Sequence, residues 1–199
     1  MSIESDARAS LLRRGLRLEY ATLAWNAGEI GFLFYAAAMS RSVALAGFAL
    51  DSCIEIFASL VVVSRLKGVS DERRERHAER MIGYAFFALA LFLTVQAVVT
   101  IVAAVHPDSS PLGIAWLAAT VVAMFTLAAA KLRTGHALNH IVLVAEAKVT
   151  MVDGALAATI LTGLVLNAAA GWWWADIAGG FVVIVYGIRE GIHAIRESK

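Results

Sequence analysis

The sequence has little cysteine, proline or charge. Its 199 residues include a single cysteine, Cys53, which excludes an intramolecular disulfide. It has only two prolines, and long unbroken apolar runs stand where β-barrel strands would alternate polar and apolar residues. Hydrophobic residues make up 60% and charged residues 17%, whereas soluble domains have roughly 45–50% and about 25%. This composition excludes a water-soluble monomer and predicts an all-α membrane protein, and the net charge of +1 gives no reason to expect a nucleic-acid partner.

Six apolar runs are each long enough to cross a bilayer, which takes about 20 residues. The predicted transmembrane helices cover residues 18–39, 42–64, 81–105, 112–130, 141–166 and 176–195. Residues 1–17 are expected to form a cytoplasmic N-terminal tail, because a long span with polar residues follows them instead of the short apolar core of a cleaved signal. Residues 18–199 are then one six-helix transmembrane domain.

The basic residues are distributed unevenly along the chain. If six spans alternate in direction, 15 of the 17 lysines and arginines fall on one side, and the positive-inside rule predicts that both termini are cytoplasmic. The Trp172-Trp173-Trp174 run then lies at the opposite surface as an interfacial belt. The charged segment 71–80, DERRERHAER, is expected to form a helix that runs into the third span. We interpret this segment either as a solvated cytoplasmic connection or as one with a metal-delivery or regulatory role through His77. We expect the protein to lie in the plasma (inner) membrane.

Carboxylates lie inside two of the predicted spans, where an ionised group costs a few kcal/mol by insertion scales. Asp51 and Glu55 are four residues apart and therefore share one face of the second span. Asp153 and Glu146 lie seven residues apart on one face of the fifth span, with Thr150 between them. Neighbouring carboxylates in a low dielectric either share a proton or bind a cation. If the two spans pack together, Asp51, Glu55 and Asp153 are expected to form an oxygen-rich cation site.

Small residues in both spans are expected to let these two helices approach closely: Gly47, Ala58, Ser59, Gly154, Ala155, Ala157 and Ala158. The alternative is that the acids only pair with bases or join helices.

Several further polar residues of the spans allow more than one interpretation. Lys148 is interpreted as the only base deep in a span, and Glu146 as either a ligand or a paired acid near the cytoplasmic end. Asn26 and Glu29 are one turn apart and either line the pathway or join helices. Cys53 points away from the acid face, so a small buried side chain is expected there rather than a ligand. His136 and His140 are interpreted as a solvated pair or a weak metal site.

Three segments together resemble the transmembrane domain of the cation diffusion facilitator family of divalent-metal/proton antiporters. Residues 41–60, RSVALAGFALDSCIEIFASL, resemble the family's second helix with its Asp/His-x-x-x-Asp ligand pair. Residues 145–153, AEAKVTMVD, resemble the fifth-helix segment Ala-Asp-Ala-x-His-x-x-x-Asp. Residues 171–176, GWWWAD, resemble the Trp-Ala-Asp entry into the sixth helix.

The resemblance implies a divalent-cation efflux transporter, not an enzyme, with Asp51, Glu55 and Asp153 as metal ligands. It also implies exchange for protons, no resident cofactor, and a homodimer in the lipid bilayer. Val149 stands where many zinc transporters of the family have histidine, and Glu55 replaces the usual aspartate. An oxygen-only set favours manganese or magnesium, although zinc is also bound by carboxylates. The family's cytosolic C-terminal domain is missing from this sequence. The alternative function is therefore a non-transporting membrane metal sensor or scaffold.

Overall fold

The computed structural model describes residues 2–67 and 72–197, and within these ranges the regular secondary structure is all α-helix. Its six helices form one bundle, in agreement with the predicted number of helices. They are α1 (Ser2–Ser40), α2 (Val43–Leu66), α3 (Glu72–Val102), α4 (Pro111–Leu138), α5 (Ile141–Ala170) and α6 (Trp174–Glu197).

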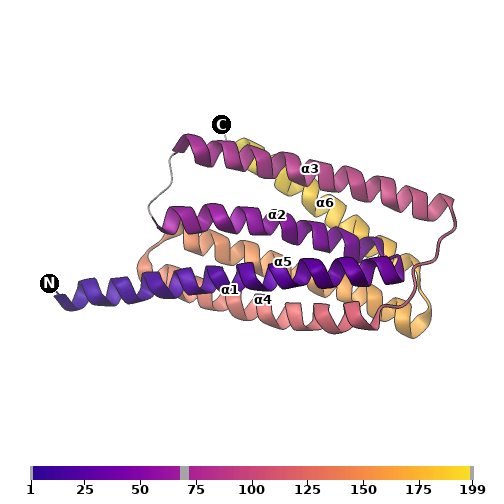
Figure 1. Cartoon of the computed structure of the whole chain (residues 1–199), viewed down its shortest axis with the longest axis horizontal. Helices are drawn as coiled ribbons and strands as arrows, with labels where there is room; N and C mark the ends of the chain where they lie inside the picture. Colours follow the sequence, from indigo (N-terminus) through magenta and orange to yellow (C-terminus); the bar gives the residue numbers. More distant parts are fainter. Residues whose placement is uncertain (1, 68–71, 198–199) are drawn as a thin grey trace.

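Successive helices run in opposite directions, so both termini lie at the same end of the bundle (Figure 1). We call this the terminal end. The last turn of α2, the first turn of α3 and the α4–α5 connection also lie there, and the α1–α2, α3–α4 and α5–α6 connections lie at the far end. α4 packs along α5, α3 packs along α6, and α1 packs against both α2 and α4. α2 contacts α3, α5 and α6 as well, which places its acidic face inside the bundle.

Five of the helices, α2 to α6, are long and apolar enough to cross a membrane. α1 is less apolar because a stripe of polar residues at helical spacing runs along it. These residues are all buried against the neighbouring helices: Glu19, Thr22, Asn26 and Glu29. Large apolar side chains of the same helix, such as Tyr35 and Met39, face outward. α1 therefore has the polar-inside, apolar-outside arrangement of a helix in a lipid-embedded bundle.

Two helix boundaries differ from the prediction in ways that matter for the interior. α1 is continuous from Ser2, so the predicted tail 1–17 belongs to the same helix as the first span wherever it is described. α4 ends at Leu138 rather than near residue 130, because the helix continues past the charged pair Lys131 and Arg133. It stops where Asn139 adopts the left-handed conformation (φ 51°) that commonly ends helices. This extension places Lys131 inside the bundle.

A side chain of α6 caps the N-terminus of α2. Asp176, in the first turn of α6, accepts hydrogen bonds from the Ser42 hydroxyl and, at 3.0 Å, from the backbone N–H of Val43. A carboxylate at a helix N-terminus satisfies donors that have no partner within the helix. The preceding Trp172 and Trp174 are exposed at the far end and stack on each other with ring centroids 5.4 Å apart.

Of the small residues that were expected to bring α2 and α5 together, Ser59 does contact α5, through Glu146, but the two glycines lie at other helix contacts. A side chain at Gly47 of α2 would meet Leu93 of α3 at 2.9 Å. A side chain at Gly154 of α5 would meet Met124 of α4 at 3.2 Å. These glycines therefore serve the α2–α3 and α4–α5 contacts, and the contact between α2 and α5 is lighter than either. The space between α2 and α5 is where the acidic side chains lie.

Candidate metal site

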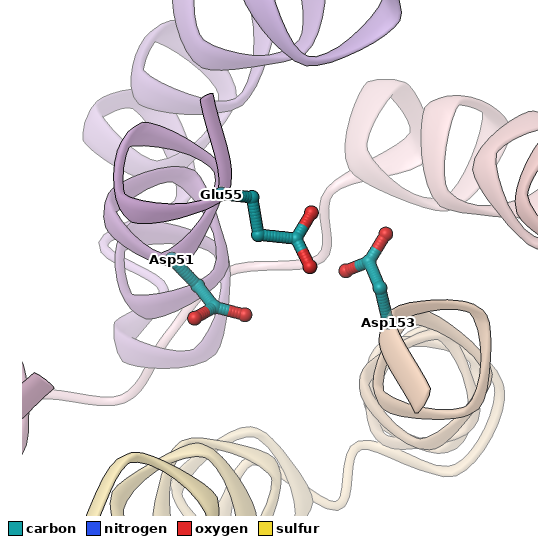
Figure 2. Close-up of side chains that lie close together, drawn as sticks. All are labelled: Asp51, Glu55 and Asp153. Carbon is teal, nitrogen blue, oxygen red and sulfur yellow. The ribbon is translucent and has the colours of Figure 1, made fainter. Parts of the chain in front are cut away.

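Three carboxylates from two helices converge inside the bundle. Asp51 and Glu55 are one turn apart on α2, and Asp153 comes from α5. One oxygen atom from each of them lies within 4.8 Å of the other two. Figure 2 shows the three side chains pointing into the space between the two helices. The predicted convergence of these residues is confirmed, and we call them the acidic triad.

The acidic triad is almost completely buried and poorly satisfied by hydrogen bonds. Exposed fractions are 0% for Asp51, 8% for Glu55 and 2% for Asp153. Four of its buried oxygens have no hydrogen-bond partner in the structure: both of Asp51, Oε1 of Glu55 and Oδ2 of Asp153. Nearly all buried polar atoms in proteins are paired, and an unpaired one calls for an explanation such as an ion. These oxygens are positioned to accept a cation or protons.

No family model matches this chain, and no curated protein matches its sequence. We therefore infer the chemistry of the acidic triad from its ligand atoms. It offers oxygen donors alone, from three groups that are negative when ionised, at separations that one ion can bridge. Magnesium, manganese and calcium prefer such donors, whereas soft thiolates and imidazoles select other metals.

Glu29 lies near the triad but is fully occupied. Its Oε1 accepts hydrogen bonds from Thr120 Oγ1 at 2.6 Å and from Trp116 Nε1 at 3.1 Å. Its Oε2 accepts one from Ser52 Oγ at 3.1 Å. These donors belong to α4 and α2, so Glu29 connects three helices. Of the two readings that the sequence left open for Glu29, the contacts favour a role in joining helices.

Asn26 lies beside the acidic triad instead. Its amide Nδ2 donates to Glu55 Oε2 at 3.1 Å, and the residue is fully buried. Asn26 and Glu29 are one turn apart on α1, yet of these two side chains only Asn26 hydrogen-bonds to a triad residue. Helix α1 therefore contributes to the surroundings of the site, although the predicted ligands came from the second and fifth spans only.

Glu146 is not brought to the triad. Its Oε1 lies 3.4 Å from Lys131 Nζ and 3.5 Å from Ser59 Oγ. The same lysine donates at 3.1 Å to Glu19 Oε2 and at 3.1 Å to Thr150 Oγ1. Among the residues described, the predicted fourth acid thus belongs to a separate buried ion-pair cluster that joins α1, α4 and α5.

Lys131 is a buried base in the interior of the bundle that was not predicted from the sequence. The expectation that Lys148 is the only base deep in a span is wrong, because Lys131 is fully buried and Lys148 is exposed. A signal was present in the sequence: Lys131 continues the helical spacing of Leu117, Thr120, Met124 and Ala128, which all face the interior. The predicted fourth span ended at residue 130, just before this lysine, so Lys131 was not counted among its inward-facing residues.

The other candidate residues lie away from the triad. Cys53 is exposed on the outside of the bundle, so it is not the small buried side chain that we expected, although it does point away from the acids. His140 caps α5 by accepting from the backbone N–H of Leu143 at 3.4 Å, and His136 is exposed. His77 is exposed near the start of α3. Of the predicted 71–80 helix, residue 71 lies outside the described residues and the rest is helical.

A cavity of about 500 Å³ leads to the triad between α2, α3, α5 and α6. Glu55 lines it, as do Val149 and the half-buried Tyr186. The lining continues to Glu190 and His193, in the last turns of α6, near the terminal end. One face of the triad is therefore next to a space large enough for a hydrated ion.

Proposed function

We propose that this protein carries divalent cations across a membrane, with Asp51, Glu55 and Asp153 as the cation site. The observation that carries the proposal is the set of four buried triad oxygens without hydrogen-bond partners. A protein can keep such groups in an apolar interior when a cation or proton occupies them during its work. The other buried acids described are better satisfied: Glu29 has three donors, and Glu19 and Glu146 share Lys131, with only Oε1 of Glu19 left without a partner.

The triad can bind either a metal ion or protons, but not both at full strength. Three carboxylates within 4.8 Å repel one another when all are ionised. A divalent cation relieves this repulsion by binding to the oxygens, and protonation relieves it by removing charge. Release of the cation is therefore linked to proton uptake by the same atoms, which is the basis of metal/proton exchange.

The cavity supplies access from one side in this arrangement of the helices. Its lining connects Glu55 with residues near the terminal end. Transport requires the opposite arrangement as well, in which the triad is open toward the far end. The light contact between α2 and α5 would let the two sides of the site separate without unpacking the tighter α4–α5 and α3–α6 pairs.

The resemblance to the cation diffusion facilitator family supports the same function. Its second-helix and fifth-helix motifs supply the residues that meet in the triad, and the Trp-Ala-Asp motif supplies Asp176, which caps α2. We propose that α1 also spans the membrane, in addition to α2 to α6, because its polar stripe faces inward. Both termini are proposed to be cytoplasmic, in a plasma (inner) membrane, on the basis of the basic residues. Manganese and magnesium are the favoured substrates, because Val149 offers no ligand atom.

Flux in proteoliposomes tests this proposal. Purified protein is reconstituted with an entrapped Mn²⁺-sensitive dye and an imposed pH gradient, and wild type is compared with Asp51→Asn. Asp108→Asn is the matched control, since Asp108 is an exposed acid paired with Arg41 at the far end. Saturable Mn²⁺ flux that is lost in the first variant and kept in the second is expected.

Equal flux in wild type and Asp51→Asn would remove the triad from the mechanism. Mn²⁺ binding by wild type without any flux would instead favour the membrane sensor or scaffold.

A further inference from the structure

The acidic triad is an incomplete coordination shell. It supplies three ligand residues from α2 and α5, whereas divalent cations with oxygen ligands take about six donors. Water or a further protein oxygen can complete such a shell, and a protein oxygen would have to come from an element that packs against α2. α1 packs along α2 and presents its polar stripe toward it.

Asn26 is the residue of that stripe which reaches the triad. Its side chain is fully buried, and Nδ2 lies 3.1 Å from Glu55 Oε2. Its carbonyl oxygen, Oδ1, is also buried and has no hydrogen-bond partner. A buried asparagine that served only to join helices would have both ends of its amide paired.

The two ends of an asparagine amide exchange places when χ2 turns by about 180°, because the nitrogen and oxygen lie symmetrically about the bond. With Nδ2 toward Glu55, the amide stabilises an ionised carboxylate. With Oδ1 toward Glu55, the same side chain presents an oxygen to whatever that carboxylate binds. Both orientations fit the same volume, since the two groups are nearly equal in size.

We propose that Asn26 is the fourth ligand residue of the cation site, with Oδ1 as the ligand atom. This inference rests on the proposed function of the triad and deepens it. A neutral amide adds a donor without adding a fourth negative charge to a site that already holds three carboxylates. It also keeps the ligand set entirely oxygen, which favours Mn²⁺ or Mg²⁺ over Zn²⁺.

Mn²⁺ binding to detergent-purified full-length protein, measured by titration calorimetry, tests the assignment. Asn26→Ala removes both the oxygen and the nitrogen, and we expect a weakening of at least about tenfold. Asn26→Asp keeps an oxygen in place and removes the N–H donor. If Oδ1 is a ligand, Asn26→Asp binds Mn²⁺ more tightly than Asn26→Ala does.

The opposite order would overturn the proposal. Asn26→Asp also adds a negative charge that attracts Mn²⁺ without ligating it, so tighter binding than in Asn26→Ala is required by the proposal but does not decide it. A third variant, Asn26→His, substitutes an imidazole nitrogen for the oxygen and should raise the ratio of Zn²⁺ to Mn²⁺ affinity by about tenfold. An unchanged ratio in a variant that still binds metal also contradicts a ligand role.

Thr22→Ala is the matched control for the helix. Thr22 lies one turn earlier on the same buried stripe, and its hydroxyl donates only to the backbone oxygen of Leu18 at 3.1 Å. Its Mn²⁺ affinity should equal that of wild type. Absence of Mn²⁺ binding in wild type would refute the proposed function itself. Normal binding by wild type, Thr22→Ala and Asn26→Ala would refute the role of Asn26 alone.

Discussion

Lys131 Nζ lies 3.1 Å from Glu19 Oε2, and both side chains are completely shielded from solvent. Glu146 lies 3.4 Å from the same nitrogen. One ammonium group therefore pairs with two carboxyl groups and connects α1, α4 and α5 at a single point. Buried ion pairs of this kind are maintained by mutual attraction, and removal of one member leaves a charge without compensation.

Lys131→Met should strongly destabilise the protein. It leaves Glu19 and Glu146 as unpaired buried acids, and breaking a buried pair in this way typically lowers the free energy of unfolding by about 3–5 kcal/mol. Lys148→Met is the control, because Lys148 is exposed on α5. Denaturant-induced unfolding in a fixed detergent measures both. Equal stabilities of the two variants would contradict the central role of Lys131.

Glu29→Ala should lower stability while leaving the cation site intact. The change removes the acceptor for Trp116, Thr120 and Ser52, and each donor left without a partner costs about 1–3 kcal/mol. Mn²⁺ affinity is expected to fall less than in Asn26→Ala, because Glu29 lies near the triad but its oxygens are occupied by Ser52, Trp116 and Thr120. A selective loss of Mn²⁺ affinity with unchanged unfolding would place Glu29 in the cation site instead.

Asp176→Ala should destabilise the start of α2. It removes the acceptor for the Ser42 hydroxyl and the Val43 N–H, and loss of a helix cap costs about 0.5–2 kcal/mol. Asp176→Asn keeps one oxygen and should recover part of that loss. Asp108→Asn, at an exposed ion pair, should change stability by less than about 1 kcal/mol. Thermal unfolding of the three variants ranks them, and a larger effect at Asp108 would contradict the assignment.

Mn²⁺ affinity should fall as the pH is lowered, because protons and the metal compete for the same carboxylate oxygens. The dependence should be shallower in Asp51→Asn, which has one fewer carboxylate to protonate and retains weaker binding. Titration at several pH values, with a fixed detergent and salt concentration, measures the slope. A slope that is identical in wild type and Asp51→Asn would show that Asp51 does not take part in the competition.

Water should reach the cavity beside the triad. In a Cys53→Ala background, Val149→Cys is expected to react with a water-soluble thiol reagent, because Val149 lines the cavity. Val122→Cys is the control: Val122 is 68% exposed on the outer surface of α4, where lipid keeps the thiol protonated and unreactive. Faster labelling of Val122→Cys than of Val149→Cys would contradict a water-filled cavity.

Local rules were enough to predict the helices and the acidic face of α2. Apolar runs of membrane length predicted six helices, and a spacing of four residues placed Asp51 and Glu55 on one face whatever the packing. The acids had to face inward because the lipid cannot solvate them. These features depend only on helix geometry and on the cost of charge in an apolar medium, so the sequence by itself determined them.

Tertiary structure decided which inward-facing groups meet. Asn26 and Glu29 follow the same spacing rule on α1, yet the first contacts Glu55 and the second is occupied by Trp116 and Thr120. Glu146 shares a face with Asp153 but pairs with Lys131, a residue that a hydropathy boundary had placed outside the membrane. Partner choice in a helix bundle depends on which helices pack together and at what height, because side chains only a turn apart then face different neighbours.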